Sequence, residues 1–201
     1  MVETMGENLD YLQKSLQKRY PNTKFELYNY GVGGDNVEMG LNRLNSNFKR
    51  GSRNYPSLMG LKPDIIIVGS FSYNPFEPQN PEKHKALLKE LAHRLRNTDA
   101  RVYILIEIAP RSANFGHGAG GVNWPEDLAK AHAEKIIGQL IDSINVANEL
   151  SVGLIDVFSK SQVFGGNFGN PFFISRYDGI HPSARGHKFT ADMISATIGL
   201  P

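Results

Sequence analysis

The chain has 201 residues, with 22 lysines and arginines against 20 aspartates and glutamates, and it contains no cysteine. This length suits a single domain over residues 1–201, and the scattered, nearly balanced charges argue against a nucleic-acid partner. Disulfides and thiolate metal sites are excluded, and no apolar run approaches the roughly 20 residues that span a bilayer, so we expect no membrane segment in this stretch.

The first predicted elements are a helix, a strand and a second helix. Leucines at helical spacing predict a helix over about residues 7–20. Alternating apolar residues predict a strand over 24–30, which runs into a glycine-rich turn. The second helix is predicted with Asp35 as its N-cap and with apolar residues at helical spacing as far as Phe48.

Strands and helices then alternate to the end of the chain. The β-branched run at 65–68 is typical of a strand buried on both faces of a parallel sheet. There follow a helix from Pro81, a strand over 102–108, a helix from Pro125, a strand over 152–158 and a last helix capped by Ser183. The pattern predicts a three-layer α/β/α fold with a parallel sheet. Such a domain normally opens with a strand, whereas this chain opens with a helix, so we expect a strand to be missing.

Chemically useful groups follow three of the predicted strands. Active sites of parallel α/β folds lie at the carboxyl ends of the strands. The first strand is followed by the glycine-rich stretch 30–35, the second by Asn74, and the last by the turn 178–181. Backbone N–H groups, a side-chain amide and an Asp-His pair at one edge are the parts of an oxyanion hole beside a general base.

The turn from Asp178 to His181 is the strongest of these signals. A carboxylate bound to one ring nitrogen of histidine fixes its tautomer, so that the other nitrogen can take a proton from a nucleophile. An Asp-x-x-His sequence is also compatible with a purely structural turn. The following Pro-Ser and the two other motifs favour the chemical interpretation.

Other candidates carry weaker signals. Ser70 and Ser72 also follow a strand, but no Gly-x-Ser-x-Gly turn surrounds them. His187 is interpreted as a packing or capping residue, and the loop 112–124 as either a substrate wall or a surface loop. The remaining histidines lack metal-site spacing, so we expect neither a metal nor a cofactor: they are His84, His93, His117 and His132.

Taken in order, these motifs resemble the SGNH hydrolase family, also called GDSL esterases and lipases, over essentially the whole chain. The YGVGGDN stretch resembles the family's Gly block, which puts Gly34 at the position whose N–H stabilises the oxyanion. PDIIIVGSFSYNPF resembles the Asn block; we assign Asn74 to the oxyanion hole, while a strict count from the start of the block points to Tyr73. DGIHPS resembles the last block, with Asp178 as orienter and His181 as base.

The family's first block, Gly-Asp-Ser, is absent. The segment 1–6 resembles the residues that directly follow this block, so the resemblance implies a nucleophilic serine immediately before Met1. It also implies a flavodoxin-like sheet of strand order 2-1-3-4-5, whose central first strand is missing. We therefore expect an N-terminally truncated, single SGNH hydrolase-type domain that is inactive as it stands.

The resemblance implies a serine ester hydrolase that acts on small-molecule acyl esters or acetylated sugars through a Ser-His-Asp triad, without a cofactor. Two alternatives stay open. One is a ligand-binding module for a glycan or acyl group, or an inactive fragment, without a nucleophile. The other is an acyltransferase on the same scaffold, because one scaffold serves many substrates.

Overall fold

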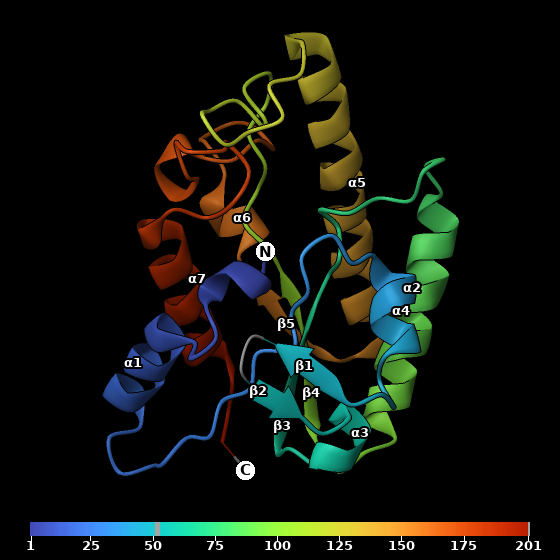
Figure 1. The fold of residues 1–201 in the computed structure, drawn as a ribbon, viewed down its shortest axis with the longest axis vertical. Helices are drawn as coiled ribbons and strands as arrows, with labels where there is room; N and C mark the ends of the chain where they lie inside the picture. The colour runs from blue at the N-terminus through green and yellow to red at the C-terminus, as the bar shows by residue number, and fades with distance from the viewer. Residues whose placement is uncertain (51–52, 201) are drawn as a thin grey trace.

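The computed structural model describes residues 1–50 and 53–200 (Figure 1). Its helices are α1 (Asp10–Arg19), α2 (Val37–Asn42), α3 (Leu58–Leu61), α4 (Pro81–Arg96), α5 (Glu126–Leu150), α6 (Phe158–Ser161) and α7 (Ala184–Thr197), with short 3-10 turns at Glu3–Met5 and Pro171–Phe173. Its strands are β1 (Phe48–Arg50), β2 (Arg53–Tyr55), β3 (Ile65–Gly69), β4 (Arg101–Ile106) and β5 (Gly153–Asp156).

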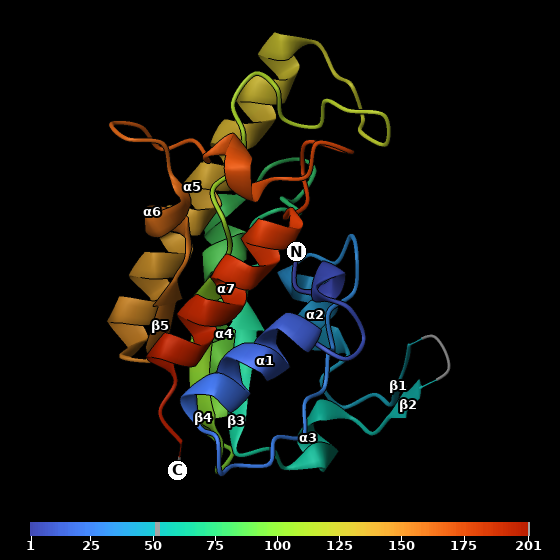
Figure 2. The ribbon, with the colours of Figure 1, turned by 90° about the vertical axis from the view of Figure 1, so that its left-hand side faces the viewer.

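The centre of the fold is a parallel sheet with the strand order β3-β4-β5. Ile67 lies opposite Tyr103, and Ile104 lies opposite Leu154. Helices α4 and α5 cover one face, and α1 and α7 cover the other (Figures 1 and 2). The predicted α/β fold, with a parallel sheet between helical layers, is confirmed.

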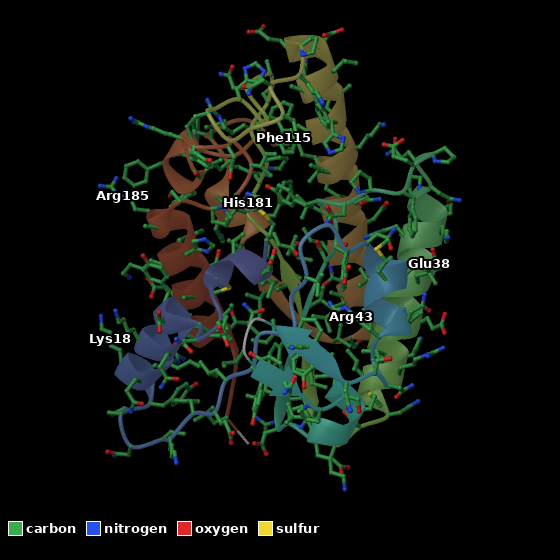
Figure 3. The ribbon with its side chains drawn as sticks, viewed as in Figure 1. Lys18, Glu38, Arg43, Phe115, His181 and Arg185 are labelled. Carbon is green, nitrogen blue, oxygen red and sulfur yellow. The ribbon has the colours of Figure 1, made fainter. Side chains whose placement is uncertain are left out.

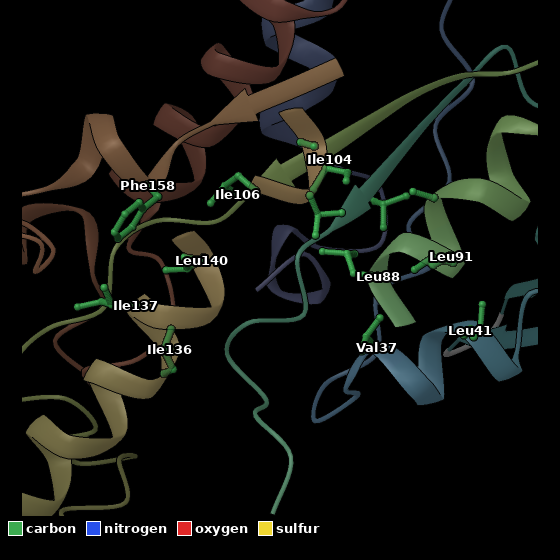
Figure 4. Packing of buried hydrophobic residues seen from close by; sticks show 14 of the residues in the cluster. Val37, Leu41, Leu88, Leu91, Ile104, Ile106, Ile136, Ile137, Leu140 and Phe158 are labelled. Carbon is green, nitrogen blue, oxygen red and sulfur yellow. The ribbon is translucent and has the colours of Figure 1, made fainter. Parts of the chain in front are cut away.

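Each face of the sheet has its own hydrophobic core, because successive side chains of a strand point to opposite faces. Ile104 packs with Leu88 of α4 and Leu140 of α5, and all three are completely buried (Figure 4). The adjacent Leu105 packs on the other side, in a cluster that contains Leu16 of α1. The remaining buried members of this second cluster are Met5, Leu9, Leu12, Ile108, Ile155, Val157, Ile174, Ala191, Ile194 and Ile198.

Most predicted elements occur close to their predicted positions. The first helix begins at Asp10, within the predicted range. Helix α4 begins at Pro81, as predicted, after an Asn80 side chain that accepts a hydrogen bond from Lys83 N. Ser183 caps α7, its side chain accepting from Gly186 N at 3.1 Å. Strands β4 and β5 are shorter than predicted, ending at 106 and 156.

The strand predicted over 24–30 is wrong, because this segment is irregular. A strand needs a neighbouring backbone, and among the described residues β3 pairs only with β4. The alternating pattern has another origin. Phe25 and Leu27 pack toward the α1 and α7 core, whereas Tyr28 packs edge-on against Tyr55 of β2.

The second helix is also shorter than predicted. Asn36, and not Asp35, is its N-cap, accepting a hydrogen bond from Met39 N at 3.1 Å. The helix ends at Asn42, and Phe48 lies in the unpredicted β1–β2 hairpin, opposite Tyr55. Aromatic packing of Phe48 on Tyr55, with ring centroids 5.8 Å apart, therefore overrides the local helical spacing.

The described part of the chain has no helix that is both long and apolar enough to cross a bilayer.

Candidate active site

The turn that carries Asp178 and His181 precedes α7 and is shaped by local hydrogen bonds. Gly179 takes a φ of 68°, in the left-handed region that favours glycine. Its N–H donates to Ser175 O at 2.9 Å, and Ser175 N donates back to His181 O at 2.7 Å. Figure 3 places His181 near the middle of the molecule, close to the end at which α7 begins.

Within this turn the Asp178 carboxylate holds the imidazole of His181. Asp178 Oδ2 lies 2.8 Å from His181 Nδ1, while Oδ1 accepts from the backbone N–H groups of Ile180 and His181 at 2.8 and 2.9 Å. Burial by itself raises the pKa of Asp178, but these hydrogen bonds outweigh it and lower the pKa below its usual value. The carboxylate therefore stays charged and directs Nδ1.

The opposite ring nitrogen of His181 is open to a reactant. The His181 side chain is 44% exposed, whereas that of Asp178 is 14% exposed. Nε2 makes no hydrogen bond to any described residue. A histidine held at one nitrogen and free at the other can accept and return a proton.

Asn74 and the glycine-rich stretch meet in space. Asn74 Nδ2 donates to Asp35 O at 2.9 Å, and the Asp35 side chain forms an ion pair with Arg43 Nε at 2.8 Å. Gly34 has a φ of 80°, which an L residue rarely adopts. A carboxamide has two N–H donors, so one is engaged with Asp35 and the second is left for a ligand.

Tyr73, the alternative to Asn74, is turned elsewhere. Its hydroxyl donates to Ile108 O at 2.8 Å, and its ring packs near Phe115. Burial raises the pKa of Tyr73 well above its usual value. Of the two side chains, only that of Asn74 donates a hydrogen bond to the glycine-rich stretch.

The first residues of the chain lie between these two parts of the site. Met1, Glu107, Pro182 and His187 are among the residues around a cavity of about 10 Å³, and the N-terminus lies beside α7 in both views (Figures 1 and 2). A Cβ at Gly33 would lie 2.5 Å from Glu3 Oε2, so the glycine-rich stretch approaches the N-terminal segment closely.

His187 lines the same cavity. Its Nδ1 is buried and has no hydrogen-bond partner among the described residues. Burial, the Met1 ammonium and His181 lower the pKa of His187 to about 4, so at neutral pH it is uncharged. Its ring is stacked near Tyr11, with centroids 6.2 Å apart, in keeping with the predicted packing role.

A profile of the GDSL-like Lipase/Acylhydrolase family matches residues 3–189. The chain belongs to this family. A comparison with curated proteins found no match.

Solved structures of low sequence identity share the fold of this GDSL-family chain. A lipase/acylhydrolase from Enterococcus faecalis has a TM-score of 0.66 at 17% identity, with 94% of this chain and 82% of that one covered. LAE5, an alpha/beta hydrolase enzyme from the metagenome of Lake Arreo, Spain, has a TM-score of 0.62 at 22% identity, with 95% and 80% covered. A catalytic mutant of Axe2, an acetylxylan esterase from Geobacillus stearothermophilus, has a TM-score of 0.63 at 16% identity, with 98% and 82% covered.

Ser70 and Ser72 of this GDSL-family chain do not have the surroundings of a nucleophile. Both are completely buried, and the Ser70 hydroxyl donates to the Glu107 carboxylate. The imidazole of His84 contacts the backbone oxygen of Ser70 at 2.9 Å and not its hydroxyl. Glu107 was missed by sequence reasoning, although a carboxylate at the end of the apolar run VYILIEI was a visible signal.

The loop 112–124 packs against the turn of Asp178. Gly116 N donates to Gly179 O at 3.2 Å, and Gly120 N donates to Tyr177 O at 2.7 Å. Phe115 is buried beside Tyr73. The loop therefore supports the turn, while its contact with a substrate stays a prediction.

Two further observations concern binding sites. In the described ranges no three His, Asp or Glu side chains come together as metal ligands would.

A larger cavity of about 330 Å³ lies at the amino ends of β4 and β5, where Arg101 and Gly153 line it. Asp178 and His181 lie beyond the other, carboxyl ends of the strands, and none of the predicted site residues lines this cavity.

Proposed function

We propose that residues 1–201 form the greater part of one serine ester hydrolase domain, with His181 as general base and Asp178 as its orienter. The observation that carries the proposal is the 2.8 Å contact between His181 Nδ1 and Asp178 Oδ2, with the imidazole exposed. Membership of a family of lipases and acylhydrolases supports it.

The nucleophile in this proposal is a serine joined to the nitrogen of Met1. Met1 lies with Pro182 and His187 around one small cavity, so a residue attached to it starts next to the His181 turn. In the described residues, β3 is paired on one side only. Its other edge offers backbone donors and acceptors to a preceding strand, which is the central strand expected from the family resemblance.

The reaction proceeds by acyl transfer. His181 Nε2 takes the serine proton as the serine oxygen attacks the acyl carbonyl carbon, and the carbonyl oxygen becomes an oxyanion. Gly34 N–H and the second N–H of Asn74 stabilise this oxyanion. His181 then protonates the leaving alcohol, and water, activated by the same imidazole, releases the carboxylic acid. No step requires a cofactor.

Esters of short acyl groups, acetylated sugars among them, are the substrates to test first. The similar fold of Axe2, an acetylxylan esterase, favours this class. The test compares the 201-residue chain with a chain extended before Met1 by one strand and Gly-Asp-Ser, here called the extended chain, on p-nitrophenyl acetate. We expect hydrolysis by the extended chain alone, and its loss by several orders of magnitude in His181→Ala.

Other outcomes assign other functions. A folded extended chain that binds acetylated xylo-oligosaccharides without hydrolysing them would be a ligand-binding module. Transfer of the acetyl group to an added sugar in preference to water would identify an acyltransferase. Equal activity of the 201-residue chain would show that the nucleophile lies within residues 1–201 and would overturn the serine assignment.

A further inference from the structure

A buried polar cluster underlies the turn that carries Asn74, and the proposed reaction does not use it. Its members are Ser70, Ser72 and Glu107. Glu107 directly follows β4 and is 6% exposed, while both serines are fully buried. A buried carboxylate is expensive unless it is well hydrogen-bonded, so its contacts indicate what it does.

The N–H, the hydroxyl and the carbonyl oxygen of Ser70 all form hydrogen bonds. Its N–H donates both to Leu105 O at 3.0 Å and to Glu107 Oε1 at 3.1 Å. Its hydroxyl donates to Glu107 Oε2, and its carbonyl oxygen lies 2.9 Å from His84 Nε2. One carboxylate therefore holds both the backbone and the side chain of Ser70.

The contacts continue from Ser70 into the turn. Ser72 N donates to Ser70 Oγ at 3.2 Å, and the two hydroxyl oxygens lie 2.7 Å apart. Because a carboxylate only accepts, the Ser70 proton goes to Glu107, and Ser70 Oγ accepts from Ser72. The order of donation is then Ser72 to Ser70 to Glu107.

The turn between Ser70 and Asn74 is strained and needs such support. Phe71 has a φ of 59°, in the left-handed region that non-glycine residues rarely adopt. Its ring lies against Gly40 of α2, where a Cβ would come 2.4 Å from the ring. Phe71 O accepts a hydrogen bond from Asn74 N at 3.1 Å, so the position of Asn74 follows from that of Phe71.

We propose that Glu107 is a positioning residue, which fixes the side-chain amide of Asn74 by clamping the Ser70–Ser72 turn. Glu107 does not touch the substrate; it acts through Ser70 on the turn that presents Asn74. The catalytic part of this inference rests on the proposed function, since it takes Asn74 as an oxyanion donor. Burial raises the pKa of Glu107, opposed by the Ser70 hydroxyl and the Met1 ammonium.

The first test measures kcat and KM of the extended chain on p-nitrophenyl acetate. Loss of a whole oxyanion donor lowers kcat by roughly 10²- to 10³-fold. Glu107→Ala displaces the Asn74 amide without removing it, so it should lower kcat by about 10-fold or more, with little change in KM. Glu107→Gln keeps an acceptor for Ser70 N and a partner for Ser70 Oγ, and it should stay within a few-fold of the parent. The matched control is Glu149→Ala, which removes an exposed glutamate paired with Lys89.

A double-mutant cycle separates positioning from general destabilisation. If Glu107 acts through Asn74, Glu107→Ala should not lower kcat further in a chain that already carries Asn74→Ala. A full additional loss in the Asn74→Ala background would show a merely structural role and overturn the proposal, as would an unchanged kcat in Glu107→Ala.

A second readout does not need activity. In the ¹⁵N-labelled 201-residue chain, the side-chain amide signals of Asn74 are identified by their absence in Asn74→Ala. Glu107→Ala should shift or broaden them, and Glu107→Gln and Glu149→Ala should leave them in place. If Glu107→Ala fails to fold, Ser70→Ala, which removes the hydroxyl contacts of Ser70 with Glu107 and Ser72 but keeps the bond from Ser70 N, should shift the same signals.

The two readouts distinguish the proposals. An inactive extended chain whose Asn74 amide responds to Glu107→Ala would reject the proposed function and support the positioning. Unperturbed Asn74 amide signals in both Glu107→Ala and Ser70→Ala would reject the positioning, whatever the activity.

Discussion

Asn74 Nδ2 donates a hydrogen bond to the carbonyl oxygen of Asp35, 2.9 Å away, across 39 residues of sequence. This bond joins the turn after β3 to the residue that follows Gly34. The two groups proposed to stabilise the oxyanion are thereby held in one unit. Arg43, which pairs with the Asp35 side chain, fixes this unit to the end of α2.

Replacement of Asn74 by alanine should lower kcat of the extended chain by about 10²- to 10³-fold and leave KM nearly unchanged. The reason is that the amide contributes to the oxyanion and not to ground-state binding. Tyr73→Phe is the control: it removes the bond to Ile108 O, so it should lower the free energy of unfolding by about 1 kcal/mol with little effect on kcat. A large loss of kcat in Tyr73→Phe, with little loss in Asn74→Ala, would instead assign the oxyanion donor to Tyr73.

Asp178→Asn should lower kcat of the extended chain by up to about 10⁴-fold while the fold is retained. The asparagine NH₂ group would face His181 Nδ1 and favour the tautomer that carries its proton on Nε2, where the base must be free. Asp192→Asn is the matched control in α7, because Asp192 is bonded to Ser15 and Lys188 at the surface. A loss of rate in Asp178→Asn no larger than in this control would exclude Asp178 from the mechanism.

Gly179→Ala should destabilise the 201-residue chain by about 1–3 kcal/mol. The φ of 68° disfavours alanine, and the added Cβ would lie 2.7 Å from both the N and O atoms of His117. Gly138→Ala in α5 is the opposite case, since the added Cβ would meet nothing within 4 Å beyond the backbone of its own helix, and it should stabilise the chain by about 0.5–1 kcal/mol. Urea unfolding measures both changes, and equal effects at the two positions would contradict the strained turn.

His187 should make stability depend on pH between about 6.5 and 4, its unfolded and folded pKa values. In this window the unfolded chain binds more protons than the folded chain, so the free energy of unfolding falls as the pH is lowered through it. Urea unfolding at pH 7 and 4.5 should therefore show a smaller loss in His187→Phe, which keeps a ring beside Tyr11. Identical losses in the parent and the variant would show that His187 does not titrate in this way.

The same experiment on the extended chain reports on Met1. The Met1 ammonium contributes to the lowered pKa of His187, after burial. Once Met1 is joined to a preceding residue this positive charge is gone, so the pKa of His187 should lie closer to 6.5. The pH-dependent loss of stability attributable to His187 should then be smaller than in the 201-residue chain.

Interactions that are local in sequence were predictable from the residues alone. Asp178 and His181 are three residues apart in one turn, and Ser183 caps the helix that starts at the next residue. The strands of the sheet and the helices around it were predictable because apolar periodicity reports which side of an element is buried. Local sequence therefore determined the α/β class and the Asp-His pair.

Contacts between distant residues were decided only by the tertiary structure. The segment 24–30 has the alternation of a strand, but a strand forms only where another backbone can pair with it. Phe48 continues a helical spacing, yet packing on Tyr55 places it in a hairpin. The positions of Asn74 against Asp35 and of Glu107 beneath Ser70 depend on how separate strands and loops are brought together, which no local pattern specifies.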